Sequence, residues 1–166
     1  EDVEGLYSWQ QVASPSFASK WKKSEPNTIN FGYTSSAYWH HIELTNNTDN
    51  IQWLLKLERP ILAELDFYEV ADGQLLLHTK VGSNNNFDQR PVDHRYFMLP
   101  LVFNRSPFNP ADNVGRDKVY KTIHIYFRIK THAPMRFPIV LWQQSAHYEY
   151  DKHNLIGKGI YFGILL

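Results

Sequence analysis

The fold of this chain is decided by the stretch Ile123-His124-Ile125-Tyr126-Phe127-Arg128-Ile129-Lys130, in which purely apolar residues occupy every second position. Successive side chains of a β-strand point to opposite faces of the sheet, so strict alternation indicates a strand with one face in a core. The inward face carries Ile123, Ile125, Phe127 and Ile129. Tyr126 and Arg128 are then expected side by side on the outward face.

A less regular alternation recurs along most of the chain. Tyr38 to Thr45 alternates, although Trp39 competes with His40 for the interior. Further strands are predicted at Gln52–Glu58, Glu64–Val70, Gln74–Lys80, Arg95–Phe103 and Phe137–Gln144, with a weaker one at Tyr7–Val12. Many short strands with turn residues between them are typical of an all-β fold, either an antiparallel β-sandwich or a jelly roll.

One turn is specific enough to predict its type. Asp72-Gly73 separates two predicted strands, and Gly accepts the positive φ angle that a type I′ hairpin turn requires. Two other connections, Ser83–Arg90 and Arg105–Lys118, are long and polar. Long loops on a β-scaffold are often functional, and a plain surface connection is an equal alternative for both.

Composition narrows the classes of function. The length of 166 residues suits one domain with a full core. The formal net charge is zero, which gives no electrostatic reason to expect nucleic-acid binding. The absence of cysteine excludes disulfides, cysteine-ligated zinc and thiol catalysis. Aromatic residues make up 15% of the chain, and they favour strands as well as flat surfaces that stack on ligands.

No pattern of residues points to catalysis or to a metal. The chain has eight histidines, but His40 and His41 are adjacent and would point to opposite faces of a strand. No HxH pair, metalloprotease motif, phosphate-binding loop or hydrolase nucleophile motif occurs. Carboxylates near strands can pair as in glycosidases, but solvated carboxylates on outward faces are the simpler expectation. We therefore expect no enzymatic activity, no cofactor and no metal.

The remaining chemical signal is a set of aromatic and basic side chains on strands and loops. An exposed Trp or Tyr offers a flat apolar face to a sugar ring, and a nearby Arg orients hydroxyl groups. The ligand-binding residues predicted on this basis are Trp39, Tyr68, Arg90, Tyr126, Arg128 and Trp142, with Tyr126 and Arg128 as the preferred pair. Core packing is the alternative for each aromatic ring, and a surface salt bridge is the alternative for each Arg. The preferred pair would equally suit a protein interface, such as that of a homodimer.

The last residues, Leu155–Leu166, form a Gly-spaced apolar run. A membrane span needs about 20 apolar residues, so this shorter run suggests the first turns of a transmembrane helix. A buried C-terminal β-strand is the alternative. The polar segment Ser145–Asn154 before it is expected to form a short helix.

The order of these features resembles a known family. The segments on which this resemblance rests are, in chain order, Ile29-Asn30-Phe31-Gly32-Tyr33, Ala37-Tyr38-Trp39, Glu64-Leu65-Asp66-Phe67-Tyr68, the Asp-Gly turn, His94-Arg95-Tyr96-Phe97-Met98-Leu99-Pro100-Leu101, Pro138-Ile139-Val140-Leu141 and the closing Gly159-Ile160-Tyr161-Phe162-Gly163-Ile164-Leu165. The chain resembles the type 2 extracellular sensor domain of bacterial seven-transmembrane receptors with diverse intracellular signalling modules.

The resemblance implies a jelly-roll β-sandwich similar to carbohydrate-binding modules, located in the periplasm as part of an inner-membrane protein. It divides the chain into a sensor domain, residues 1–154, and the start of the first transmembrane helix, residues 155–166. The implied partners are a small, carbohydrate-like ligand and the protein's own transmembrane and cytoplasmic signalling domains. The alternative is a carbohydrate-binding module of a secreted hydrolase.

Overall fold

Nine β-strands and four helical segments make up the part of the chain that the structure describes, residues 1–23, 29–104 and 119–164 of a computed structural model. The strands are β1 (Ile29–Asn30), β2 (Tyr38–Thr45), β3 (Gln52–Leu57), β4 (Glu64–Ala71), β5 (Gln74–Val81), β6 (Phe97–Val102), β7 (Thr122–Lys130), β8 (Arg136–Phe137) and β9 (Ile139–Gln143). The α-helices are α1 (Trp9–Ala13) and α2 (Gln144–Ile164), and the 3₁₀-helices are η1 (Pro15–Lys20) and η2 (Phe87–Gln89).

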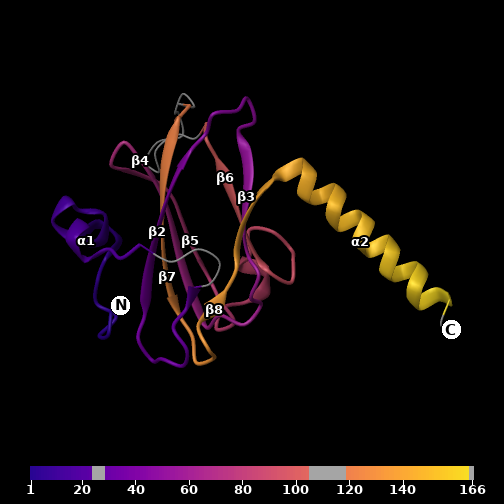
Figure 1. The fold of residues 1–166 in the computed structure, drawn as a ribbon, viewed down its shortest axis with the longest axis horizontal. Helices are drawn as coiled ribbons and strands as arrows, with labels where there is room; N and C mark the ends of the chain where they lie inside the picture. Colours follow the sequence, from indigo (N-terminus) through magenta and orange to yellow (C-terminus); the bar gives the residue numbers. More distant parts are fainter. Residues whose placement is uncertain (24–28, 105–118, 165–166) are drawn as a thin grey trace.

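Two antiparallel sheets form the body of the molecule (Figure 1). The larger sheet has the strand order β2-β7-β4-β5, the smaller one has the order β6-β3-β9, and a short ribbon pairs β1 with β8. The predicted all-β fold built from antiparallel sheets is therefore confirmed. Its description as a jelly roll stays a prediction.

The predicted strands agree with the observed ones to within a few residues, with two exceptions. The predicted strand Tyr7–Val12 is wrong, because this segment contains helix α1. The side chain of Ser8 accepts a hydrogen bond from Gln11 N, and the side chain of Gln11 accepts one from Ser8 N. This reciprocal capping box begins a helix. The other predicted strand, Phe137–Gln144, is split into β8 and β9 at Pro138, which has no N–H to donate to a sheet.

The Asp72-Gly73 turn has the predicted geometry. Asp72 has a φ angle of 49° and Gly73 one of 73°. Two consecutive positive φ angles are the mark of a type I′ turn. The turn joins β4 to β5 with Ala71 opposite Gln74, so the hairpin is confirmed. The predicted loop Ser83–Arg90 contains η2, and Arg105–Lys118 lies outside the described residues.

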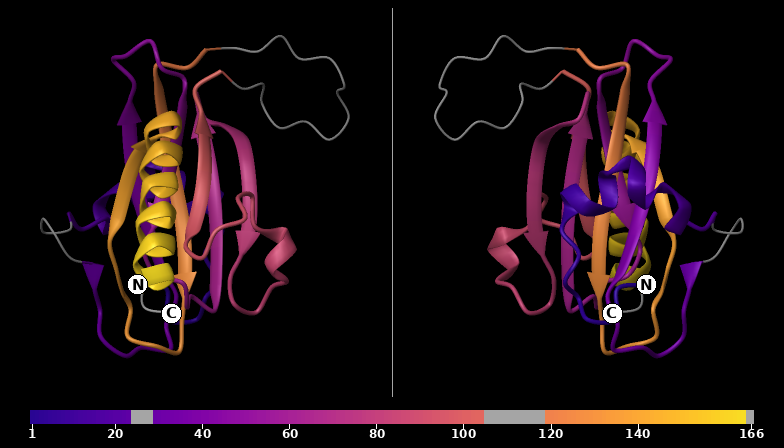
Figure 2. Two further views of the ribbon diagram at one scale, coloured as in Figure 1. Left: turned by 90° about the vertical axis from the view of Figure 1, so that its right-hand side faces the viewer. Right: turned by 90° about the vertical axis from the view of Figure 1, so that its left-hand side faces the viewer.

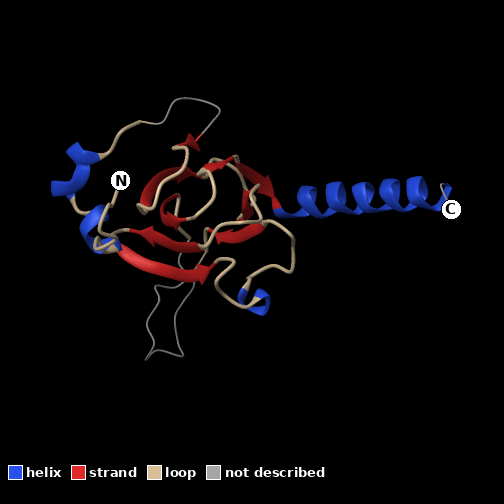
Figure 3. Cartoon of the chain, turned by 90° about the horizontal axis from the view of Figure 1, so that it is seen from below, coloured by secondary structure: helices blue, strands red, loops and turns tan. Residues whose placement is uncertain are grey.

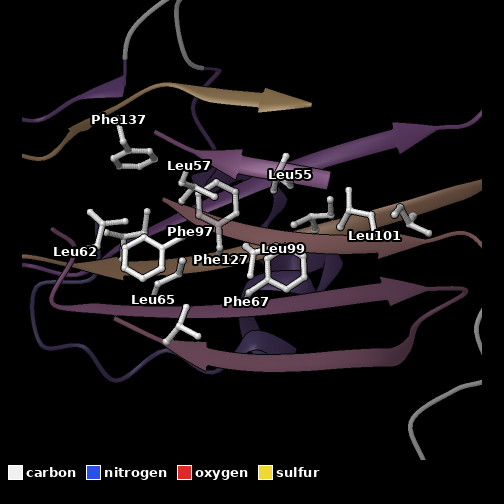
Figure 4. Packing of buried hydrophobic residues seen from close by; sticks show 14 of the residues in the cluster. Leu55, Leu57, Leu62, Leu65, Phe67, Phe97, Leu99, Leu101, Phe127 and Phe137 are labelled. Carbon is white, nitrogen blue, oxygen red and sulfur yellow. The ribbon is translucent and has the colours of Figure 1, made fainter. Parts of the chain in front are cut away.

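The core lies between the two sheets (Figure 4). Ile123, Ile125, Phe127 and Ile129 of β7 are all fully buried there, as the alternation predicted. They pack against apolar side chains of the facing sheet, including Leu55, Leu57, Phe97, Leu99 and Leu101. Trp39 and His40 both pack against other residues, on opposite sides of β2. Trp39 is buried on the outer side, and His40 stacks on Phe127 in the core at a ring distance of 4.9 Å.

Helix α2 follows β9 with no residue between them and projects away from the sandwich (Figure 1). The predicted helix at Ser145–Asn154 is confirmed as its first part. Leu155–Leu166 is helical as far as Ile164, so the buried-strand alternative is wrong. Leu155, Ile156 and Ile160 are exposed on this helix. Among the described residues, no helix combines the length and the apolar character needed to cross a membrane.

The placement of His40 predicts a pH dependence of stability. Burial lowers the pKa of His40 from 6.5 to about 4, and its Nε2 has no hydrogen-bond partner within the described part of the chain. Between these two values the unfolded chain binds a proton that the folded domain does not. The free energy of unfolding therefore keeps its full value above pH 6.5. As the pH falls from 6.5 toward 4, this group lowers it by about 3 kcal/mol. Urea denaturation at stepped pH values measures the loss.

The His40→Phe variant should flatten this acid slope, since Phe fills the aromatic site and takes up no proton. His132→Phe is the matched control, because His132 is exposed, and it should leave the slope unchanged. An equally steep slope in His40→Phe and in the unmodified chain would assign the pH dependence to other groups.

Candidate functional site

A row of aromatic rings crosses the outer face of the four-stranded sheet. His41 of β2, Tyr126 of β7, Tyr68 of β4 and His78 of β5 are direct cross-strand neighbours. The His41 and Tyr126 rings stack at 4.5 Å and the Tyr68 and His78 rings at 4.4 Å, with interplanar angles of 7° and 4°. Such cross-strand pairs stabilise a sheet.

The N-terminal segment covers much of this row. Trp9 of α1 stacks on Tyr68 at 6.2 Å, and Trp21 lies 6.3 Å from Tyr126. Val12 is buried with Trp39, Val70 and Tyr126 in an apolar cluster that is separate from the core between the sheets. The outward face of β7 is therefore not open as the alternation suggested, and Tyr126 is only 7% exposed. Figure 2 shows α1 and η1 lying over the outside of the sheet.

One buried carboxylate attaches the N-terminal segment to the sheet. Asp2 is 3% exposed, and its carboxylate accepts hydrogen bonds from Leu6 N, Tyr7 N and Trp39 Nε1 at 3.1, 3.1 and 3.2 Å. Its backbone N–H and C=O pair with those of Ala37. Trp39 is thus committed to packing and to this anchor.

The guanidinium of Arg128 is held by two carboxylates. Its Nη1 donates to Glu64 Oε2 at 3.2 Å and to Asp66 Oδ2 at 3.5 Å. Tyr126 and Arg128 thus share the outward face of β7, as the alternation predicted, and Trp39 and Tyr68 lie on the same face of the sheet. The charge of Arg128 is already paired with acidic side chains of β4.

An open hollow of about 380 Å³ lies between α1, the β4–β5 turn and β7. Its lining residues are Trp9, Gln10, Ala13, Ser14, Val70, Gly73, His124 and Tyr126. The partly exposed Trp9 ring provides apolar surface, Tyr126 lies almost completely buried beneath it, and Gln10, Ser14 and His124 provide hydrogen-bonding groups. Burial, and secondarily the carboxylate of Glu43, raises the pKa of Tyr126, so its hydroxyl remains protonated at neutral pH.

His124 connects the hollow to a small polar group on β2. Its Nδ1 lies 3.2 Å from His41 Nε2 and 3.8 Å from Glu43 Oε2. Burial, and next the neighbouring His124, lowers the pKa of His41. Within residues 1–23, 29–104 and 119–164, no group of three or more His, Asp or Glu side chains is arranged to hold a metal ion. The residues that line the hollow offer stacking and hydrogen bonding.

Two of the predicted site residues lie elsewhere. The guanidinium of Arg90 lies 4.5 Å from the Phe87 ring and 4.4 Å from the Phe97 ring, and it donates to His94 O at 2.9 Å. It therefore holds the loop before β6 in place. Trp142 is on β9 of the smaller sheet and packs on helix α2.

Of the residues that line the hollow, the sequence interpretation included only Tyr126 among the ligand-binding residues. The residues it missed include Trp9, Gln10 and His124. Trp9 and Gln10 fell within the segment taken for a strand. The Ser8 and Gln11 capping box was the signal that could have placed them on a helix. The alternation in β7 places His124 on the same outward face as Tyr126, but nothing in the sequence indicates that α1 lies beside it.

A comparison with models of protein families gives one match, to 7TMR-DISM extracellular 2, over residues 1–143. The matched residues run through every strand of both sheets and stop where α2 begins. The chain belongs to the 7TMR-DISM extracellular 2 family. No curated protein is similar enough to the chain to count as a match.

The resemblance stated from the sequence is thereby confirmed. A 7TMR-DISM extracellular 2 domain is the extracellular sensor of a membrane receptor and lies on its periplasmic side. The family also links this domain to transmembrane and intracellular signalling modules. Every residue that lines the hollow falls within the matched range. Helix α1 and the projecting helix α2 lie at opposite sides of the sandwich (Figures 2 and 3).

Proposed function

We propose that this sensor domain binds a small, carbohydrate-like ligand in the hollow between α1 and the four-stranded sheet. The observation that supports it is the lining of the hollow, where the Trp9 and Tyr126 rings stand beside Gln10, Ser14 and His124. Sugar recognition combines a flat apolar surface with hydroxyl-orienting polar groups. Trp9 is partly exposed, so it offers ring surface that a ligand can reach.

The charges around the hollow favour an uncharged ligand. None of the residues that line it is Lys or Arg, and Arg128 nearby is paired with Glu64 and Asp66. A uronate or a phosphosugar would lie there without a counter-charge, next to the carboxylate of Glu43, which is 3.8 Å from His124. A neutral sugar needs only the stacking and hydrogen-bonding groups present.

Signalling would follow from a shift of population between two arrangements of the N-terminal segment that lies over the sheet. A ligand that contacts both α1 and β7 binds more tightly when α1 is closed over the sheet, so it increases the share of that state. We further propose that residues 1–154 form the sensing unit and that 155–166 begin the first transmembrane helix. The exposure of Leu155, Ile156 and Ile160 supports this division.

A glycan array followed by calorimetric titration tests the proposal on the chain of 166 residues. We expect a neutral glycan to bind. Trp9→Ala should raise the Kd for this glycan about tenfold or more, because an aromatic stacking contact contributes about 1 kcal/mol in addition to the effect of its buried area. Tyr33→Ala is the matched control, because Tyr33 is exposed and does not line the hollow.

Two results would count against the proposal. Binding that Trp9→Ala and Tyr33→Ala affect equally would place the ligand outside the hollow. An array in which only acidic glycans bind would contradict the assignment of a neutral ligand.

A further inference from the structure

The side chain of His147 is enclosed where helix α2 leaves the sandwich. It is 2% exposed, and its ring meets Trp142 of β9 edge-on at 5.4 Å and His94, from the loop before β6, at 5.8 Å. Neither ring nitrogen has a hydrogen-bond partner among the described residues. A neutral imidazole tolerates this site as a small aromatic ring, whereas a charged imidazolium would be buried without an acceptor.

The charged and titratable groups around this site come from each element packed against it. They are Lys56, Glu58, His94, Tyr96, Tyr148 and Asp151. Burial, and next the positive charge of Lys56, lowers the pKa of His147, while Asp151 acts in the opposite sense. Lys56 is itself buried and pairs with Glu58 Oε1 at 2.8 Å, so it stays in place as a neighbouring cation.

His94 does not offer a hydrogen-bond acceptor to a charged His147. Its Nδ1 accepts a hydrogen bond from Tyr96 N at 3.0 Å, so the proton of the neutral ring is on Nε2. That nitrogen lies 3.8 Å from Asp151 Oδ2. Asp151 is therefore shared with His94, one turn along α2 from His147.

We propose that His147 is a pH-sensitive latch that holds the first turns of α2 on the three-stranded sheet when neutral and releases them when protonated. Helix α2 contacts β3 and β9, and it projects away from the sandwich beyond its first turns (Figure 1), so its attachment is at one end. The freed histidine binds a proton below pH 6.5, and the docked one binds it only at lower pH. The equilibrium constant for docking of α2 on the sheet therefore falls by up to about tenfold for each pH unit below 6.5.

This latch would give the receptor a second input, the proton concentration of the periplasm. It lies on the side of the sandwich opposite to α1 (Figure 3), and it does not depend on a ligand in the hollow. The two inputs would meet at α2.

Distance measurements between paired spin labels test the latch. The chain has no cysteine, so Lys80→Cys on β5 and Asn154→Cys on α2 provide the labelling sites. We expect one narrow distance distribution at pH 7.5 and a second, broader population that grows as the pH falls from 6.5 to 5. A pair within the sandwich, Lys80→Cys with Gln52→Cys, should stay narrow throughout.

Variants at the histidine complete the test. His147→Phe keeps a ring that cannot be protonated, and it should give the narrow distribution at every pH, with His147→Leu as a substitute if Phe impairs folding. His153→Phe, at an exposed position of the same helix, should respond like the parent chain. The proposal is overturned if the parent distribution does not change down to pH 5, if His147→Phe responds as the parent does, or if the sandwich pair broadens as well.

Discussion

Replacing Ile125 with Asp is expected to lower the free energy of unfolding by about 5 kcal/mol, enough to unfold a domain of ordinary stability. Ile125 is fully buried between the two sheets. Its cross-strand neighbours are Ile42 on β2 and Glu69 on β4. Glu69 is also fully buried, so the new carboxylate would be buried beside an existing acidic side chain. Guanidinium denaturation followed by circular dichroism measures the change.

Ile125→Val is the matched control for this prediction. It removes one methylene group from the same site and should cost about 1 kcal/mol. A melting temperature of Ile125→Asp close to that of the parent chain would show that this face of β7 is not the core.

Replacing Gly82 with Ala is expected to cost about 3 kcal/mol or more, which is exceptional for the addition of one methyl group. Gly82 follows β5 with a φ angle of 149°, a conformation that other residues rarely adopt. A Cβ atom there would overlap with the carbonyl oxygen of Ala63. The backbone cannot move away easily, because Ser83 N donates to Leu62 O at 2.7 Å.

Gly32→Ala separates the close contact from the effect of a positive φ angle alone. Gly32 has a φ angle of 62°, and a Cβ atom there would meet nothing within 4 Å. We expect a cost of about 1 kcal/mol for that variant. Equal costs at the two glycines, measured as denaturation midpoints, would mean that the loop after β5 can shift away from Ala63.

The strands were predictable because their signal is local. The alternation in Ile123–Lys130 and the Asp72-Gly73 turn each depend on neighbours in the sequence, and both are confirmed. The helix α1 was missed because two aromatic residues, Tyr7 and Trp9, suggested a strand. The capping box formed by Ser8 outweighs that preference in the structure.

The site was less predictable because it depends on contacts between distant segments. Tyr126 and Arg128 were expected on one outward face, and the structure places them there together with Trp39 and Tyr68. The sequence could not show that Asp2 would attach the N-terminal segment over them. Nor could it show that Arg90 would lie against the rings of Phe87 and of Phe97 at the start of β6.

The direct passage from β9 into α2 makes the helix a lever arm. At 1.5 Å per residue, its 21 residues extend about 30 Å from their attachment. A tilt of about 5° where Gln144 follows Gln143 would displace the far end by roughly 2.6 Å over that length. No linker residue separates strand and helix to absorb such a tilt. A small rearrangement within the sheets would therefore produce a larger displacement at the distal end of α2.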